Sequence, residues 1–222
     1  MIQDLMSLVF GRPCLLELEY ALDAGDQPLL DDESGSPVWS EVYEPSYGRS
    51  SSGLAALSDK RQPLFRLADV DPEKLAQWLD EADTWSRPTA IVVTTMFLKN
   101  STVETQLLQM GVGLEALGYA LWLEAGNRAA GTGTPNFLPL LRQVHKPAAD
   151  ARPALPGGLS DPGWPARFNA AFKGAKHADN QAVAATLARQ MYREGLALVR
   201  FWLGNRLGVS DETMVNGLGL GG

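Results

Sequence analysis

Cysteine and histidine are scarce in this chain. Cys14 is the only cysteine among 222 residues, which excludes disulfides within the chain and zinc sites built from several cysteines. The two histidines, His145 and His177, argue against a histidine-rich metal site. We therefore predict no metal ion, and we expect no other cofactor.

Long hydrophobic runs are also missing. The longest apolar stretch, residues 90–98, is too short to cross a bilayer, and the first residues carry no basic leader before an apolar run. We expect a soluble, cytoplasmic protein without a membrane partner. With 45% hydrophobic residues, the chain is long enough to bury the core of one domain or of two small ones.

Basic residues are outnumbered by acidic ones in the whole chain, but one segment carries a net positive charge. The net charge of −7 argues against indiscriminate nucleic-acid binding. Residues 161–207 hold seven basic and three acidic side chains and so carry +4, which leaves −11 for the remainder. A specific contact with a polyanion is compatible with this segment, although basic helices also occur without one.

The first 70 residues contain few signals for an independent core. A short helix is predicted over residues 4–10, a strand over 13–22, a possible second strand over 38–43 and an extended piece over 59–67. Much of the rest, from 23 to 62, is rich in Asp, Gly, Ser and Pro. Two or three short strands are marginal alone, so this region resembles the edge of an incomplete sheet.

Helical signals begin at Asp71. Asp71, Pro72 and Glu73 form a helix start, which predicts a helix to about residue 84. Residues 88–99 fit a helix or a strand, and residues 101–104 (STVE) read as a capping box. The clearest helix follows and ends near Gly126; its apolar stripe is Val103, Leu107, Met110, Leu114, Leu117 and Leu121.

The next segment has weaker signals. Residues 131–135 (GTGTP) indicate a turn rather than a phosphate-binding loop, because no strand precedes them. A shorter helix is predicted over 136–145, and a loop rich in Pro, Gly and Asp over 147–165. His145 has no evident partner in the sequence, and we interpret it as incidental.

Residues 167–180 hold the most informative pattern. In a helix, Asn169, Lys173, Lys176 and Asn180 share one polar stripe, while Phe168, Phe172 and Ala175 occupy another face. His177 then lies beside the polar stripe and faces water or a partner. It is either a chemical group or a merely solvated histidine.

A final helix is predicted over residues 181–207. Arg189, Arg193 and Arg200 fall on one side of it, and Leu187, Met191, Leu198 and Trp202 form an apolar row. The arginines form either a basic row that binds RNA or the solvated face of an amphipathic helix.

Five short motifs in this order resemble the ApeA-like HEPN family: QPLFRLADV from Gln62, KLAQWL from Lys74, FL from Phe97, QMGVGLEAL from Gln109 and KHAD from Lys176. The resemblance implies a mostly α protein. A HEPN-like helical bundle over 71–210 follows a small, incomplete β-containing segment over 1–70, and 211–222 form a flexible tail. The chain is shorter than typical members, so we expect either a truncated member or a fragment.

The resemblance also implies a function. Proteins of this family act in bacterial anti-phage defence by abortive infection, and HEPN ribonucleases cut RNA such as tRNA without metal, usually as dimers. They use an arginine and a histidine separated by four to six residues. Here the corresponding positions before His177 hold Phe172, Ala171 and Ala170, and Arg167 is too far back. Lys173, one turn before His177, is the nearest substitute, but it lacks the bidentate fork of arginine.

Three hypotheses stay open. In the first, a homodimer cleaves RNA with His177 as general acid and base, Lys173 or Lys176 on the phosphate, and Asn169 or Asn180 orienting it; Arg189, Arg193, Arg200 and Asn180 would bind RNA. In the second, the domain is a non-catalytic module that binds RNA or docks on a partner. In the third, it is a purely structural bundle.

Overall fold

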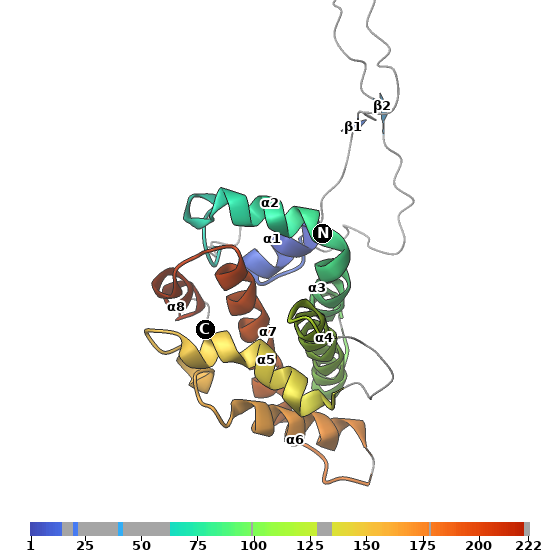
Figure 1. The fold of residues 1–222 in the computed structure, drawn as a ribbon. Helices are drawn as coiled ribbons and strands as arrows, with labels where there is room; N and C mark the ends of the chain where they lie inside the picture. The colour runs from blue at the N-terminus through green and yellow to red at the C-terminus, as the bar shows by residue number, and fades with distance from the viewer. Residues whose placement is uncertain are drawn as a thin grey trace, which may run out of the picture. The chain divides into compact units, whose positions relative to one another are not determined.

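The computed structural model describes residues 1–14, 20–21, 40–41, 63–98, 100–127, 135–177 and 179–219. The chain divides into two compact units, one formed by Met1–Cys14 with Lys60–Gly222 and the other by Leu15–Asp59. The larger unit is a bundle of α-helices (Figure 1). The prediction of a mostly α, bundle-like protein is therefore confirmed.

The smaller unit contains one short strand pair among its described residues. Strand β1 (Tyr20–Ala21) pairs antiparallel with β2 (Ser40–Glu41), with Tyr20 opposite Glu41. Both strands fall inside the predicted segments 13–22 and 38–43. Most of those two segments lies outside the described residues, as do residues 59–62 of the predicted third extended piece. The described part of that piece ends in a 3-10 turn, Leu67–Asp69.

Eight helices are described in the larger unit. α4 contacts α3, α5, α6 and α7, so it is the central element of the bundle. Figure 1 shows α1 and α2 at one end of the unit and α6 at the other. The helices are α1 (Ile2–Phe10), α2 (Pro72–Asp80), α3 (Ala82–Phe97), α4 (Val103–Glu124), α5 (Phe137–Asp150), α6 (Trp164–Lys176), α7 (Ala185–Arg206) and α8 (Asp211–Gly219).

The start of α2 follows the prediction. The Asp71 carboxylate accepts hydrogen bonds from the backbone N–H groups of Glu73 and Lys74, at 2.9 and 3.4 Å. The predicted end at residue 84 was wrong, because the chain turns at Glu81 and α3 begins at Ala82. The predicted capping box was also wrong in its first residue: Thr102, and not Ser101, accepts from the backbone N–H of Thr105 and begins α4.

Residues 88–97, for which the sequence left helix and strand open, are helical and belong to α3. Val92 and Val93, whose branched side chains left helix and strand open, are fully buried within α3. Pro88 lies inside the same helix. The hydroxyl of Thr89 donates to the Trp85 carbonyl at 2.7 Å, so a side-chain hydrogen bond contributes to the backbone hydrogen bonding near this proline.

Three glycines let other helices approach α4 closely. A Cβ at Gly111 would lie 2.3 Å from the Phe172 ring, one at Gly113 would lie 2.6 Å from Val92, and one at Gly118 would lie 2.7 Å from the Leu140 carbonyl. These residues face α6, α3 and α5 in turn. The predicted stripe supplies the core between the glycines, with Leu107, Met110, Leu114 and Leu117 buried.

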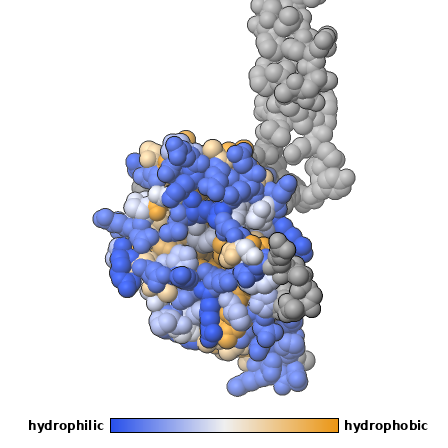
Figure 2. Space-filling model, in the orientation of Figure 1, coloured by the Kyte–Doolittle hydropathy of each residue, from blue (hydrophilic) through white to orange (hydrophobic). Residues whose placement is uncertain are grey.

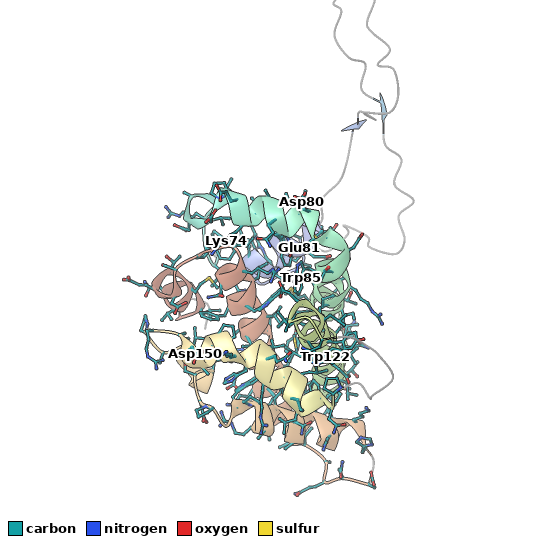
Figure 3. All side chains as sticks on the ribbon, in the orientation of Figure 1. Lys74, Asp80, Glu81, Trp85, Trp122 and Asp150 are labelled. Carbon is teal, nitrogen blue, oxygen red and sulfur yellow. The ribbon has the colours of Figure 1, made fainter. Side chains whose placement is uncertain are left out.

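A tryptophan cluster packs the end of the bundle near α2. Trp78, Trp85 and Trp202 meet with ring centroids 5.3 to 6.1 Å apart. Arg206 lies 4.1 Å over the Trp85 ring and pairs with Glu81 and Glu124. Glu81 and Trp85 are labelled in Figure 3 at the junction of α2 and α3. The cluster and the ion pairs of Arg206 therefore connect α2, α3, α4 and α7.

The predicted boundary at residue 70 was wrong for the N-terminal helix. α1 packs against α3 and α7 and belongs to the same compact unit. The predicted tail 211–222 was also wrong in part, because α8 places Met214 against Gly204 of α7. Likewise α5 continues to Asp150, five residues beyond the predicted end, and shortens the predicted loop 147–165.

Candidate functional site

α6 presents the predicted polar residues outward. Phe168 and Phe172 are buried in the core, while Lys173 and Lys176 are exposed and Asn169 is half-buried. The amphipathic pattern of the sequence is therefore confirmed over this helix. The buried phenylalanines fix which side of α6 faces solvent.

The helix ends earlier than the pattern predicts. α6 stops at Lys176, and His177 adopts an extended backbone (φ −115°, ψ 120°). The Lys173 carbonyl accepts from the His177 N–H and from the Asn180 side-chain amide, both at 3.1 Å. Asn180 N–H in turn donates to the His177 carbonyl at 3.1 Å. Asn180 therefore closes the end of α6 instead of extending its polar stripe, and the prediction was wrong for this residue.

A pocket of about 480 Å³ brings four of the predicted residues together. We call it the polar pocket. The start of α5 forms the opposite wall, and Glu115 of α4 contributes a carboxylate. Its lining residues are Glu115, Asn136, Phe137, Leu138, Pro139, Asn169, Phe172, Lys173, Lys176 and His177.

The charge of the polar pocket suits an anion. Two lysines face one carboxylate, and the exposed His177 adds an imidazole ring to the lining. The Lys176 ammonium also lies 5.6 Å over the Phe172 ring, which holds this side chain beside the pocket. Glu115 was not among the predicted site residues, although it lies within the motif QMGVGLEAL of α4.

Arg167 is engaged outside the polar pocket. Its guanidinium pairs with the Asp161 carboxylate, and hydrogen bonds from Gly163 N–H and from Arg167 lower the pKa of Asp161. Arg167 lines a second groove, of about 700 Å³, together with Asn180 and Leu187. No arginine lines the polar pocket among the residues that the structure describes.

The predicted basic row on α7 does not form. Arg189 and Arg193 are exposed, but Arg200 is largely covered by α1 and donates to the Leu8 and Val9 carbonyls at 2.7 and 3.1 Å. Burial lowers its pKa to about 10. Arg200 therefore joins α7 to α1 and does not share the exposed surface of Arg189 and Arg193. The predicted apolar row was also wrong at Leu187, which is exposed.

His145 is a core residue with partners. Its Nε2 atom lies 2.6 Å from the Leu159 carbonyl oxygen, and its ring stacks on Trp164 with centroids 5.5 Å apart. Burial lowers the pKa of His145. His145 therefore has partners that the sequence did not reveal, because the contact of Leu159, in the predicted loop 147–165, with His145 forms only in the folded chain.

The described ranges contain no group of three or more His, Cys, Asp or Glu side chains arranged to hold a metal ion. None of the described helices is long and apolar enough to span a membrane. Figure 2 shows polar side chains over most of the visible face, with apolar side chains in smaller patches between them.

No protein-family model, curated protein or solved structure matches this chain.

Proposed function

We propose that this chain is a HEPN-type, metal-independent endoribonuclease and that the polar pocket is its active site. The proposal rests on one observation: Asn169, Lys173, Lys176 and His177 line a single pocket beside an exposed helix end. Two adjacent cations suit a phosphate, and the neighbouring imidazole suits proton transfer. The family resemblance of the sequence supports His177 as general acid and base, with Lys173 as the nearest substitute for the family's arginine.

The chemistry needs few protein groups because RNA carries its own nucleophile. The 2′-oxygen attacks the adjacent phosphorus, the bond to the 5′-oxygen breaks, and a 2′,3′-cyclic phosphate and a 5′-hydroxyl result. His177 takes the 2′-hydroxyl proton or protonates the leaving oxygen. Lys173 and Lys176 stabilise the charge on the phosphorane oxygens, and Asn169 orients the phosphate.

Each pocket holds one histidine, whereas the reaction uses both an acid and a base. We propose a homodimer that brings two polar pockets to one RNA, so that one His177 acts as base and the other as acid. Within this proposal the substrate is an RNA such as tRNA, and the biological setting is cytoplasmic anti-phage defence by abortive infection.

The test is cleavage of tRNA and total RNA by the purified chain in the presence of a chelator. We expect His177→Ala to lose at least about 100-fold in rate, as removal of a general acid or base does. Lys173→Ala should lose activity that Lys173→Arg retains, while the exposed Lys146→Ala serves as a matched control outside the pocket. Equal cleavage by wild type and His177→Ala would contradict the mechanism.

A specific observation favours a second function. The arginine nearest to His177 in sequence, Arg167, pairs with Asp161, and lysines alone supply the cations of the polar pocket. The alternative is a non-catalytic HEPN module that binds RNA through this pocket or docks on a partner. RNA binding that depends on Lys173 and Lys176, with no cleavage by any variant, would establish it.

A further inference from the structure

A further surface groove, of about 450 Å³, lies between α3 and α4. We call it the α3/α4 groove. Its walls include Val112 and Leu123, which are 44% and 41% exposed, and the aromatic side chain of Tyr119. The Tyr119 ring stacks on Trp122 with centroids 5.7 Å apart, which restrains its orientation. The volume lies in the range of sites for small molecules, roughly 300 to 1,000 Å³.

The charge of the α3/α4 groove is opposite to that of the polar pocket. Asp83 and Glu115 oppose a single cation, Arg87. An excess of carboxylate disfavours a phosphate and favours a neutral group that donates hydrogen bonds. Apolar and aromatic walls suit the flat face of a nucleobase.

Glu115 belongs to both sites. It lines the polar pocket and the α3/α4 groove, so the two hollows meet at one carboxylate on α4. A ligand with a phosphate in one hollow and a base in the other would place the base edge beside Glu115. A carboxylate accepts hydrogen bonds, and at the position where cytosine donates them from its exocyclic amino group, uracil presents a carbonyl acceptor.

We propose that the α3/α4 groove is a nucleobase subsite for the nucleotide next to the phosphate held in the polar pocket. Tyr119 stacks on the base, and Glu115 accepts from its exocyclic amino group. The subsite therefore selects cytosine over uracil, whose edge presents a carbonyl in that place. This inference rests on the proposed function, since it takes RNA as the ligand of the polar pocket.

The test measures binding of the full chain to fluorescent single-stranded oligonucleotides. We would use 2′-O-methyl oligo-C and oligo-U of about ten nucleotides, within the range of known single-strand binding sites. The methyl group blocks the nucleophile, so affinity is measured without cleavage. The two bases are both pyrimidines and differ at the amino or carbonyl group, which makes oligo-U the matched control for oligo-C.

Wild type should bind oligo-C about tenfold more tightly than oligo-U, the discrimination that a carboxylate contact to a cytosine amino group supplies. Tyr119→Leu should weaken binding of both about tenfold through the lost stacking. Glu115→Gln should bring the ratio of the two affinities to about one, because an amide both accepts and donates. Glu212→Gln on α8 removes the same charge outside both hollows and should leave the ratio unchanged.

Three results would overturn the inference, and they separate it from the proposed function. If wild type binds both oligonucleotides equally, or if Glu115→Gln keeps the preference for oligo-C, Glu115 does not recognise the base. If Tyr119→Leu binds as wild type, the groove takes another occupant, such as an apolar segment of a partner protein; in each case the polar pocket remains an RNA site. If wild type binds neither oligonucleotide, the proposed function fails as well. Circular dichroism would confirm that every variant is folded.

Discussion

The two ends of the helical unit use their cations differently. At the α1/α2 end, Arg200 donates to backbone carbonyls of α1, and Arg206 pairs with Glu81 and Glu124 over the Trp85 ring. At the α6 end, Lys173 and Lys176 are exposed and line an open pocket. The first end uses positive charge to join helices, whereas the second leaves it available to a ligand. Charge along the sequence is therefore a poor guide to function until its partners are known.

Loss of Trp85 should have the largest effect on the α1/α2 end. The side chain is fully buried, contacts two other tryptophans and lies under Arg206. We expect Trp85→Ala to lower the free energy of unfolding by about 4 kcal/mol, because it leaves a large cavity. Urea denaturation would measure it. Trp122→Ala, at a half-buried position, is the control and should lower the free energy of unfolding much less. A similar loss of stability in both variants would contradict the special role of Trp85 in joining the helices.

Substitution of Arg200 should have the next largest effect. Arg200→Met keeps the length of the side chain but removes its hydrogen bonds to the Leu8 and Val9 carbonyls, which we expect to cost about 2 kcal/mol. A Cβ at Gly11 would lie 3.0 Å from the Arg200 guanidinium carbon, so this contact also needs the glycine that ends α1.

The control for Arg200 is another arginine of the same helix. Arg189→Met removes an exposed side chain and should change the free energy of unfolding by less than about 0.5 kcal/mol. RNA binding offers the complementary readout, since Arg200→Met should leave the affinity of the folded protein unchanged. A loss of RNA affinity in a folded Arg200→Met variant would contradict the contrast, because it would show that a cation at the α1/α2 end also contributes to RNA binding.

The smallest predicted effect concerns acid stability at the α1/α2 end. Hydrogen bonds from Trp85, Gln77 and Arg206 lower the pKa of Glu81 to about 2 from its ordinary 4.5. Since the folded carboxyl has the lower pKa, its stabilising contribution is complete above pH 4.5 and is lost as the pH falls towards 2.

Glu81→Gln should therefore be less stable than wild type at neutral pH, and the difference should shrink as the pH falls from 4.5 to 2. Thermal unfolding at several pH values would measure it. The control is Glu73→Gln, an exposed carboxylate in the first turn of α2. A difference between Glu81→Gln and wild type that stays constant over this window would contradict the role of Glu81.

Local signals predicted the helices and the main candidate site. The cap at Asp71 and the stripe of α4 depend on neighbours within a few residues, so the sequence contains what is needed to find them. The same holds for α6, whose phenylalanines and polar residues already define two faces. For this reason Asn169, Lys173, Lys176 and His177 were found together before the structure placed them in one pocket.

Contacts between distant segments were not predictable in this way. A helical projection places Arg200 beside Arg189 and Arg193, but it contains no information that α1, nearly two hundred residues away, covers only Arg200. Glu115 was missed because its neighbours in the polar pocket come from α5 and α6. The break between α2 and α3 likewise accompanies long-range contacts, namely those of Glu81 and Trp85 with Arg206.

By itself, the sequence determined that this chain is mostly helical, that α6 is amphipathic, and that His177 and two lysines face outward from its end. Periodicity and capping decide these features because they act over one or two turns of backbone. Tertiary structure alone decided which cations are free. Whether an arginine is buried against a carbonyl or open to a ligand depends on helices that meet only after folding, and on the glycines of α4 that let them approach.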